Sequence, residues 1–548
     1  MAILFGVAFS AFGQSPSVGL PAEAKAEDAT ITQFGHATMA MEVKIVTDSL
    51  TRRTDTVWEL ADIEWDTPSG TAKRRNAELE RGNDPIGSNF ENGVHSWWRD
   101  FNYYTFNYPS INAEGQPVLL SALACMPDED CSEVNNVIIG CHVTITSNKE
   151  CPSEYRNTGS VGSDVSMLIN HASSGLVFHS SQGNMAYYNL VILPDYEGYG
   201  ITRSHAHPYL FQELTARQVV DGARYGLVLY RNSPTINSIR HPFRDGWRTI
   251  CVGYSQGGSV AMATQRFIEQ NGLSEELRLA GSVCGDGPYD PIATLLYYVN
   301  QYNDGNNMSM PVVMPLILKG MCDSNPFMKN HQVSDYLNQE FLNSGILTWL
   351  TEKEKTTDNI TGAFINYYRY HFANWPEYVN EAPSTGDLTL TLKLNNILTP
   401  AGLEFFQQLY NNNHDIYTSP AGVPLPEQRS LMEDLHFALA SNNLTKGWQP
   451  QHALMLYHSF EDTVVPEANR ESARNSFPSW VIRLHASGVE QFDHVGTGVQ
   501  FFTGTAKDAA IRILSGAPVQ QTEETVANLW RQMWDYDDNN LEDNPYEH

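Results

Sequence analysis

Six short apolar runs, separated by stretches long enough to form helices, constrain the fold of this chain more than any other feature. Residues 213–230 and 256–269, between the runs, have the length and apolar spacing of helices. Strands that are apolar on both faces must be covered on both faces, so the pattern predicts an α/β fold with a mostly parallel sheet flanked by helices. The predicted strands are residues 137–142, 190–194, 249–252, 279–284, 453–457 and 480–484.

The spacing of these runs also predicts the domain organisation. About 160 residues separate the fourth run from the fifth, which is too long for a loop in a compact domain, so we interpret them as an inserted, mainly helical cap. Residues 103–108 and 117–123 flank a Gly-containing turn and predict a hairpin. We expect a signal peptide at 1–13, an irregular N-terminal extension with a few strands at 14–100, a core at 101–288 and 451–516, the cap at 289–450, and a C-terminal helix with an acidic tail at 517–548.

The net charge and the N-terminal segment bear on partners and location. A net charge of −29 disfavours nucleic acid, because phosphates would be repelled, and disfavours purely electrostatic docking on anionic membranes. Residues 2–12 form an apolar stretch that is too short to span a bilayer and is followed by small residues, as at a signal-peptide cleavage site. No Lys or Arg precedes Lys25, so the positive start typical of such signals is missing. We expect an exported soluble protein, secreted or periplasmic, without a transmembrane span.

Seven cysteines are consistent with export. Cys251 and Cys284 lie inside apolar runs and are expected to be buried free thiols. No C-x-x-C or His-rich spacing indicates a metal, and no cofactor is expected. Four further cysteines cluster in one region, where we expect one or two disulfides with the pairing left open: Cys125, Cys131, Cys141 and Cys151.

Ser255 is the central residue of segment 253–257, Gly-Tyr-Ser-Gln-Gly, which directly follows an apolar run and precedes a helix-like stretch rich in small residues. This is the strand–turn–helix context of a nucleophile elbow, a tight turn that lifts the serine Oγ clear of the sheet. The flanking glycines remove side chains that would clash at that turn. The segment therefore predicts Ser255 as a catalytic nucleophile.

A serine hydroxyl needs a base, and the base needs an orienting carboxylate. On elbows of this kind the acid and then the histidine follow the serine along the chain. Asp462 lies in a turn after the fifth predicted strand; a turn-stabilising role is equally open, and Glu461 is the rival carboxylate. His494 lies 32 positions after Asp462, in a polar, Gly-rich loop after the last strand, whereas His485 ends that strand and is less suitable. We predict the triad Ser255, Asp462 and His494.

The negative charge of a tetrahedral intermediate needs two backbone N–H groups aimed at it. One is expected from Gln256, immediately after the nucleophile at the start of its helix. The other is expected from the loop after the strand 137–142, where Val143 and Thr144 are the candidates. His142 is expected to shape that loop.

Aromatic residues in two regions invite a substrate-binding interpretation. We interpret the first, Asp195 with Tyr196 and Tyr199, as a tight turn built around glycines. The second lies in the insertion, where aromatic residues at helical spacing are more often core than an acyl pocket. It comprises Tyr297, Tyr298, Tyr302, Tyr367, Tyr368, Tyr370 and Trp375.

Four segments together resemble the secreted-lipase branch of the α/β-hydrolases, the serine esterases and lipases with a large helical insertion. The resemblance covers roughly residues 100–290 and 450–515. It implies an α/β-hydrolase fold with Ser255 as nucleophile, Asp462 as acid and His494 as base. These enzymes often have His-Gly after the third strand, where this chain has His142-Val143. The segments are 253–258, 194–200 followed by 207–209, 462–466 and 493–496.

The sequence thus predicts an exported serine hydrolase that cleaves carboxylic esters through an acyl-enzyme, as an esterase or lipase does. The substrate is expected to be a small-molecule, lipid or polysaccharide ester, and acyl length and oligomeric state remain open. One alternative is a serine peptidase, because the same triad hydrolyses amides. Another is a non-catalytic binding protein on a hydrolase scaffold, which the intact Ser, Asp and His disfavour.

Overall fold

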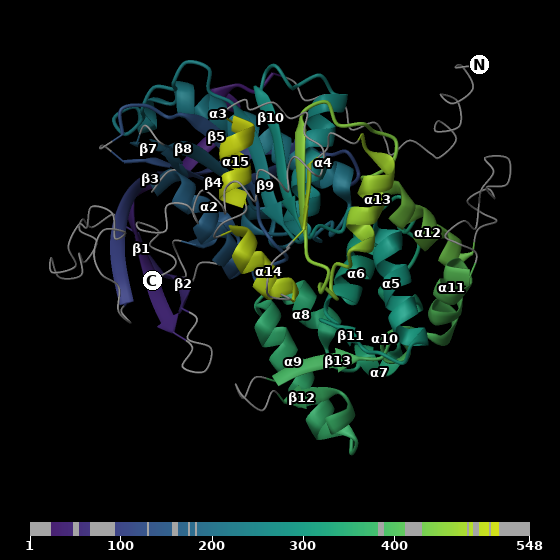
Figure 1. Ribbon diagram of the computed structural model, residues 1–548. Helices are drawn as coiled ribbons and strands as arrows, with labels where there is room; N and C mark the ends of the chain where they lie inside the picture. The colour runs from purple at the N-terminus through teal and green to yellow at the C-terminus, as the bar shows by residue number, and fades with distance from the viewer. Residues whose placement is uncertain are drawn as a thin grey trace.

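The computed structural model describes residues 23–47, 54–65, 94–128, 131–155, 163–173, 176–180, 183–381, 388–411, 430–478, 482–485, 493–502 and 506–514. Its centre is a 10-stranded sheet in the order β15-β14-β10-β9-β5-β8-β4-β3-β1-β2 (Figure 1). The predicted signal peptide at 1–13 and the predicted C-terminal helix and tail at 517–548 lie outside the described residues.

Six strands of this sheet run parallel and coincide with the six predicted runs. Four of them, β5, β8, β9 and β14, are buried along their whole length, as strands covered on both faces must be. The predicted α/β class is confirmed. The strands are β5 (Asn136–Cys141), β8 (Asn189–Pro194), β9 (Thr249–Tyr254), β10 (Leu279–Gly285), β14 (Ala453–His458) and β15 (Ile482–His485).

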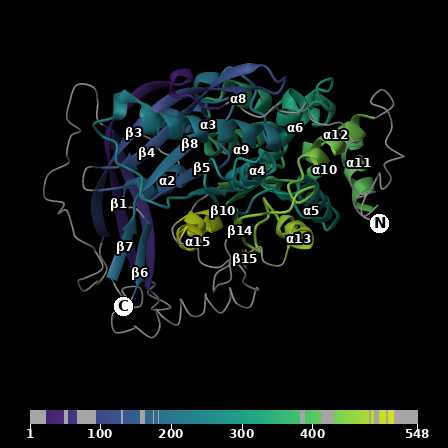
Figure 2. The same ribbon diagram turned by 90° about the horizontal axis from the view of Figure 1, so that it is seen from above.

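Helices cover the two faces of the parallel strands (Figure 2). On one face, α3 (Gln212–Asn232) and α4 (Gln256–Gln270) pack in a cluster that includes Cys251. On the other, α2 (Ser163–Ser173) and α15 (Ala506–Leu514) pack in a cluster that includes Ile250 and Val252, the neighbours of Cys251 on β9. Side chains of β9 therefore alternate between two apolar cores.

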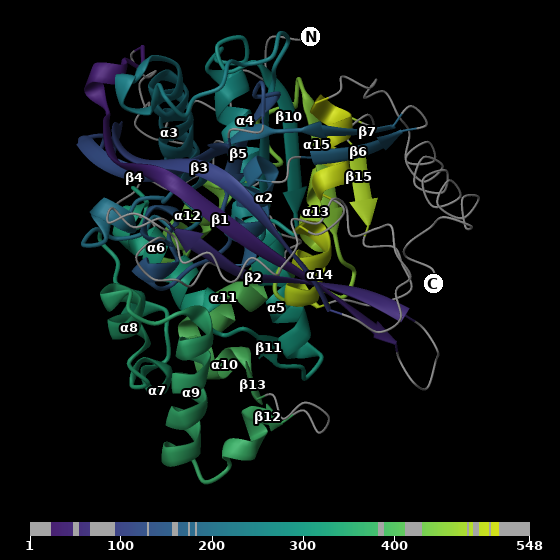
Figure 3. The same ribbon diagram turned by 90° about the vertical axis from the view of Figure 1, so that its left-hand side faces the viewer.

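Antiparallel strands extend the sheet beyond β8 (Figure 3). The predicted hairpin is confirmed, since Ile111 on β3 (Val94–Ile111) pairs with Pro117 on β4 (Pro117–Pro127). The N-terminal extension was expected to hold a few strands, and its described part contains the long strands β1 (Thr30–Thr47) and β2 (Thr54–Trp65). β1 pairs with both β3 and β2, and its apolar residues Ala37 and Met39 are fully buried.

Most helices of the insertion lie together beyond one end of the sheet (Figure 1). They pack around an apolar core of their own that contains Tyr298 and Tyr368, so these aromatic residues are core as predicted, whereas Tyr370 is 85% exposed. The domain boundaries stay predictions. The elements are α5 (Pro291–Asn303), β11 (Met308–Ser309), α6 (Val313–Ser324), α7 (Gln339–Leu342), α8 (Ile346–Glu352), α9 (Thr357–His371), β12 (Val379–Glu381), β13 (Leu388–Leu392), α10 (Leu394–Ile397), α11 (Pro400–Asn411) and α12 (Leu431–Ser441).

The remaining elements are short. Among the described helices, none is long and apolar enough to cross a membrane. A separate hairpin and two helices complete the core: β6 (Leu176–Ser180), β7 (Gly183–Tyr187), α13 (Ala468–Ser476) and α14 (His494–Gln500). Single 3-10 turns lie at Ala26–Asp28, Asn148–Glu150, Pro152–Glu154, Gly200–Thr202, Pro234–Ile236, Val333–Asp335 and Trp375–Glu377.

All seven cysteines lie in described parts of the chain and are buried free thiols. The expectation of disulfides among Cys125, Cys131, Cys141 and Cys151 is therefore wrong, and that of free thiols at Cys251 and Cys284 is confirmed. The reason is topological. Cys125 packs in the cluster on one face of the sheet and Cys141 in the cluster on the other, so nearness in sequence does not bring them together.

Candidate active site

The turn between β9 and α4 holds Ser255 in a strained conformation, with φ 57° and ψ −126°. A non-glycine residue at positive φ costs about 1–3 kcal/mol and persists only where its surroundings enforce it. Here the backbone is crowded: a Cβ on Gly253 would lie 2.2 Å from the carbonyl oxygen of Gly257, and one on Gly257 would lie 2.1 Å from that of Cys141. Only glycine fits at either position, so the elbow depends on crowding within the turn and against the end of β5.

The structure brings the three predicted triad residues together. His494 Nε2 lies 2.8 Å from Ser255 Oγ, and His494 Nδ1 lies 2.5 Å from Asp462 Oδ2. All three are buried, with Ser255 and His494 each 8% exposed and Asp462 2% exposed. Because Asp462 can only accept when ionised, Nδ1 carries the hydrogen and Nε2 is free to take the serine proton.

Asp462 fulfils both roles that the sequence left open. Its Oδ1 accepts the backbone N–H groups of Val464 and Val465, each at 2.8 Å, which is a turn-stabilising role, while its Oδ2 faces His494. Burial alone would raise the pKa of the Asp462 carboxyl, but the charge and hydrogen bond of His494 outweigh it and lower that pKa to about 2. The rival Glu461 is exposed.

His494 is the first residue of α14, and Asp493 caps that helix by accepting the Gly496 N–H at 2.8 Å. The ring of His494 packs against Tyr254 at a centroid distance of 5.3 Å, and the Tyr254 hydroxyl lies 2.6 Å from the His494 carbonyl oxygen. His485 is the last residue of β15, and it is His494 that meets Ser255.

One of the two candidates for the second oxyanion donor is already engaged. The Val143 N–H donates to Asp164 Oδ2 at 2.9 Å, so this prediction is corrected and Thr144 is the remaining candidate. Within the described residues, no acceptor is recorded for the backbone N–H of Gln256 or of Thr144. His142 shapes the loop as expected, because its Nδ1 lies 2.7 Å from the Val143 carbonyl oxygen and its ring stacks on Tyr196 at 3.9 Å.

His207 is hydrogen-bonded to the side chain of Gln256, a contact that was not predicted from the sequence. Its Nδ1 donates to the Glu197 carbonyl at 2.8 Å, so its Nε2 is unprotonated and accepts the Gln256 side-chain amide at 3.0 Å. Burial lowers the pKa of His207 to about 3, which keeps the ring neutral. The sequence did offer a signal for His207, because segment 207–209 is one of those that carry the family resemblance.

Lys353, in the insertion, was also missed. Its Nζ donates to the carbonyl oxygens of Gly198 at 2.6 Å, Arg203 at 3.1 Å and His205 at 2.5 Å, and so ties the insertion to the loop after β8. Burial lowers the pKa of Lys353 to about 8. No local pattern marks a lysine whose partners lie about 150 residues earlier.

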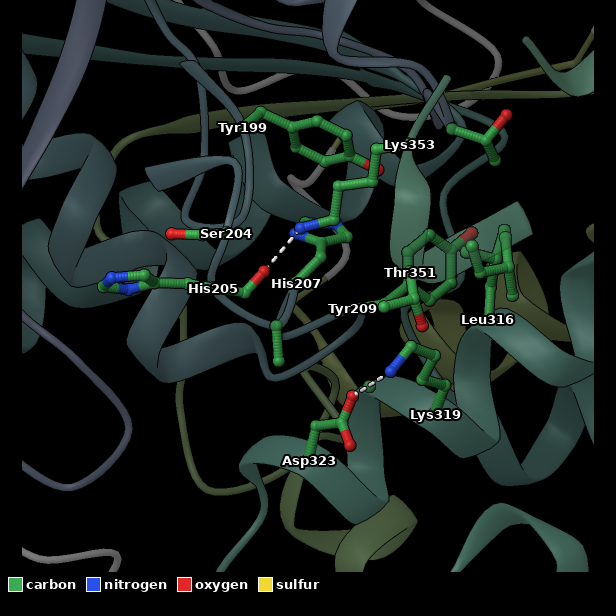
Figure 4. A pocket seen from close by; sticks show the side chains of 14 residues that line it. Tyr199, Ser204, His205, His207, Tyr209, Leu316, Lys319, Asp323, Thr351 and Lys353 are labelled. Atoms are coloured by element: carbon green, nitrogen blue, oxygen red, sulfur yellow. Dashed lines mark hydrogen bonds and ion pairs between the residues drawn. The ribbon is translucent and has the colours of Figure 1, made fainter. Parts of the chain in front are cut away.

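A cavity of about 290 Å³ lies between the core and the insertion (Figure 4). Tyr199, His207 and Tyr209 contribute from the loop after β8, and Lys319 on α6 and Thr351 on α8 contribute from the insertion. Two lining residues touch the predicted oxyanion residues, because His207 contacts the Gln256 side chain and the Tyr209 hydroxyl lies 2.9 Å from Thr144 Oγ1. The cavity is therefore lined by two residues that contact the side chains of Gln256 and Thr144.

Two groups of His and Asp residues in the described part of the chain bring ligand-type atoms within 4.8 Å of one another. In the first, Thr38 and Asn102 donate into the two carboxylates. In the second, backbone N–H groups and His494 donate into the carboxylates. We assign neither group as a metal site. The groups are His36 with Asp100 and Asp128, and Asp286 with His458 and Asp462.

Asp195 is a structural residue of the turn after β8, as the sequence analysis favoured. It is 1% exposed, its Oδ2 lies 2.5 Å from Ser121 Oγ, and its Oδ1 accepts the Ser153 N–H at 2.8 Å. Burial, which outweighs these hydrogen bonds, raises the pKa of the Asp195 carboxyl to about 7. Folding therefore keeps a proton on this group that the unfolded chain releases near the ordinary aspartate pKa of 3.8.

This shift predicts how an Asp195→Asn variant responds to pH. The stability contributed by the protonated Asp195 is fully present below pH 3.8 and is lost as the pH rises through about 7. Since Asn imitates the protonated carboxyl and does not titrate, the variant should gain about 2 kcal/mol on the wild type between pH 5 and pH 8. Thermal denaturation midpoints across this range measure the trend. The exposed Asp304→Asn is the control, and a constant difference between Asp195→Asn and wild type would contradict the prediction.

No protein-family model and no curated protein sequence matches the chain. Solved structures do: a candidate hydrolase from Legionella pneumophila is 17% identical with a TM-score of 0.52, over 76% of this chain and 89% of that one. The rice cell wall degrading esterase LipA from Xanthomonas oryzae is 18% identical with a TM-score of 0.51, over 76% of this chain and 90% of that one. The chain has an α/β-hydrolase fold.

Proposed function

We propose that this protein is a serine hydrolase that cleaves carboxylic esters through an acyl-enzyme. The observation that carries the proposal is the continuous chain of contacts from Ser255 Oγ through His494 to Asp462, at a strained elbow on an α/β-hydrolase fold. A serine whose only task is structural does not need a base and an aligned carboxylate. Ester rather than amide hydrolysis is favoured because LipA, which shares the fold, is an esterase.

The geometry supports the following reaction. His494 Nε2 accepts the Ser255 proton, and the alkoxide attacks the carbonyl carbon of the ester. The N–H groups of Gln256 and Thr144 stabilise the oxyanion of the tetrahedral intermediate, and Asp462 stabilises the imidazolium. The intermediate collapses to the acyl-enzyme as the alcohol leaves with the proton from His494. Water then repeats the sequence and releases the acid.

A fluorophosphonate probe and a substrate panel test the proposal. The probe should label Ser255 covalently, with the adduct located by peptide mass spectrometry. Activity on p-nitrophenyl acyl esters should exceed that on aminoacyl or prolyl anilides. Faster cleavage of the anilides would favour a serine peptidase, and absence of labelling together with absence of turnover would favour a non-catalytic binding protein.

We further propose that the protein is exported, as a secreted or periplasmic enzyme, on the basis of the apolar residues 2–12. Expression of the full chain with cell fractionation tests this. Recovery of the protein outside the cytoplasm, shortened at its N-terminus near residue 13, is the expected result. An uncleaved protein found in the cytoplasm alone would contradict it.

The cavity beside the oxyanion donors is proposed to hold one arm of the ester. Thr351 is exposed and lines it, so Thr351→Trp should fill the cavity without disturbing a core. We expect kcat/KM for long-chain esters to fall by about tenfold, within the range for altered pocket contacts, and that for acetate esters to change little. Glu352→Trp, the exposed neighbour outside the lining, is the matched control. If Thr351→Trp lowered kcat/KM equally for short and long esters, the cavity would not be part of the substrate-binding site.

A further inference from the structure

The end of β10 lies between the strands that carry the nucleophile and the acid. The carbonyl oxygen of Gly285 accepts the Ser255 N–H at 2.9 Å. The next residue, Asp286, donates its own N–H to the carbonyl of Tyr457 on β14 at 2.9 Å, five residues before Asp462. Asp286 has a positive φ of 33° and is fully buried. Its place in the backbone is therefore set by both neighbouring strands.

The side chain of Asp286 contacts the other two triad segments. Its carboxyl lies close to that of Asp462, with an oxygen of each within 4.8 Å of the other, and its Oδ1 accepts the Ser459 N–H at 3.0 Å. Its Oδ2 lies 2.8 Å from the Tyr254 hydroxyl, which in turn lies 2.6 Å from the His494 carbonyl oxygen. One carboxyl thus joins the acid turn directly and the histidine helix through a single tyrosine.

These contacts require a hydrogen on Asp286. The Tyr254 hydroxyl has one hydrogen and two short oxygen contacts, and the His494 carbonyl cannot donate. The second hydrogen must therefore come from Asp286. The nearby Asp462 favours the same protonation state, because two neighbouring ionised carboxylates repel each other and Asp462 is the one that its histidine keeps ionised.

The titratable groups that face Asp286 agree with this assignment. They are Asp462, His458, Tyr254 and Tyr289. Burial and, after it, the negative charge of Asp462 raise the pKa of Asp286 well above its usual value.

His458 is the rival holder of this proton. Its Nε2 donates to the Val465 carbonyl at 2.9 Å. Its Nδ1 is 3.4 Å from Asp286 Oδ1, and within the described chain this buried nitrogen has no hydrogen-bond partner. Burial lowers the pKa of His458 to about 4, so the ring is neutral and the proton belongs to Asp286.

We propose that Asp286 is a positioning residue: a neutral carboxyl whose hydrogen bonds with the Ser459 N–H and the Tyr254 hydroxyl hold the acid turn and the histidine in register with Ser255. It keeps the negative charge on Asp462 alone and fixes the orientation in which Asp462 accepts from His494. The inference rests on the proposed ester hydrolysis for its kinetic test, and its spectroscopic test is independent of turnover.

Two variants distinguish the effect of the hydrogen on Asp286 from the effect of the size of its side chain. Asp286→Asn stays neutral, keeps a donor and tolerates positive φ, so kcat should stay close to wild type and the acid limb of kcat/KM against pH should not move. Asp286→Ala removes the donor, so kcat should fall by about 10- to 100-fold with little change in KM, as for other groups that orient a reacting residue. Asp221→Ala, a buried carboxyl on α3 away from the site, is the matched control and should lower the denaturation midpoint without this loss of kcat.

The infrared difference spectrum of wild type minus Asp286→Asn at neutral pH reads the protonation directly. A carbonyl band of a protonated carboxylic acid is expected, and a carboxylate band in its place would overturn the proposal even if esterase activity is confirmed. The proposal would also be overturned if the acidic midpoint of kcat/KM against pH fell by about one unit in Asp286→Asn. Such a shift would mean that the variant had lost a negative charge near His494. If Asp286→Ala does not fold, the infrared and pH measurements on Asp286→Asn still test the proposal. If Asp286→Ala folds and keeps wild-type kcat, Asp286 is a packing residue and the proposal is wrong.

Discussion

Ester hydrolysis by Ser255→Ala should fall by about four to six orders of magnitude in kcat, because the variant has no atom to form the acyl-enzyme. KM should change little, since Ser255 contributes its hydroxyl to the reaction and not to ground-state binding. His494→Ala should lose about as much as Ser255→Ala, and the double variant little more, because residues that act as one unit are not additive. Initial rates with p-nitrophenyl esters, with active enzyme counted by fluorophosphonate labelling of wild type, measure these values.

The matched control is Ser238→Ala, an exposed serine after α3 that is remote from the elbow. It should keep wild-type activity and wild-type labelling. Ser255→Ala should not be labelled, and its denaturation midpoint should stay close to that of wild type, since the change removes one hydroxyl and leaves the backbone of the strained turn as it is. Full esterase activity in Ser255→Ala would end the assignment of the nucleophile.

The elbow could be predicted because its sequence pattern is local. The strand, Ser255 and the two glycines follow one another directly, although the space that Gly257 leaves is taken by the backbone of Cys141 on β5. Asp462 and His494 needed one further step. The carboxyl ends of parallel strands share one edge of a sheet, so residues after β14 and β15 could be placed near those after β9 before any distance was known.

What could not be predicted depends on contacts between distant segments. Val143 looked as suitable as Thr144, and it is Asp164 on α2 that captures its amide. Lys353 resembles any surface lysine until the loop after β8 surrounds its ammonium with carbonyl oxygens. Asp286 did carry a signal, because it follows a predicted strand at the edge where Ser255 and Asp462 lie. Its neighbouring glycines made it look like an ordinary turn residue.

Asp462→Asn should reduce kcat by about 10,000-fold while leaving the fold intact. The Oδ1 bonds to Val464 and Val465 can persist in Asn, but an amide nitrogen in place of Oδ2 donates to His494 where the carboxylate accepted. The imidazole then turns to the other tautomer, its Nε2 carries the hydrogen, and it cannot take the proton of Ser255. Loss of the carboxylate also removes the charge that stabilises the imidazolium in the transition state.

Glu461→Gln provides the matched control for this variant, because it removes a carboxylate one residue away that is exposed. Its kcat should equal that of wild type, and the contrast between the two separates a specific role of Asp462 from a general effect of acidity in the turn. The measurement is kcat against pH for wild type and both variants. A loss in Glu461→Gln that matches the loss in Asp462→Asn would transfer the role to the neighbour. Retention of activity in both would mean that His494 is oriented by another group, and Asp286, whose carboxyl lies near that of Asp462, would then be the first residue to test.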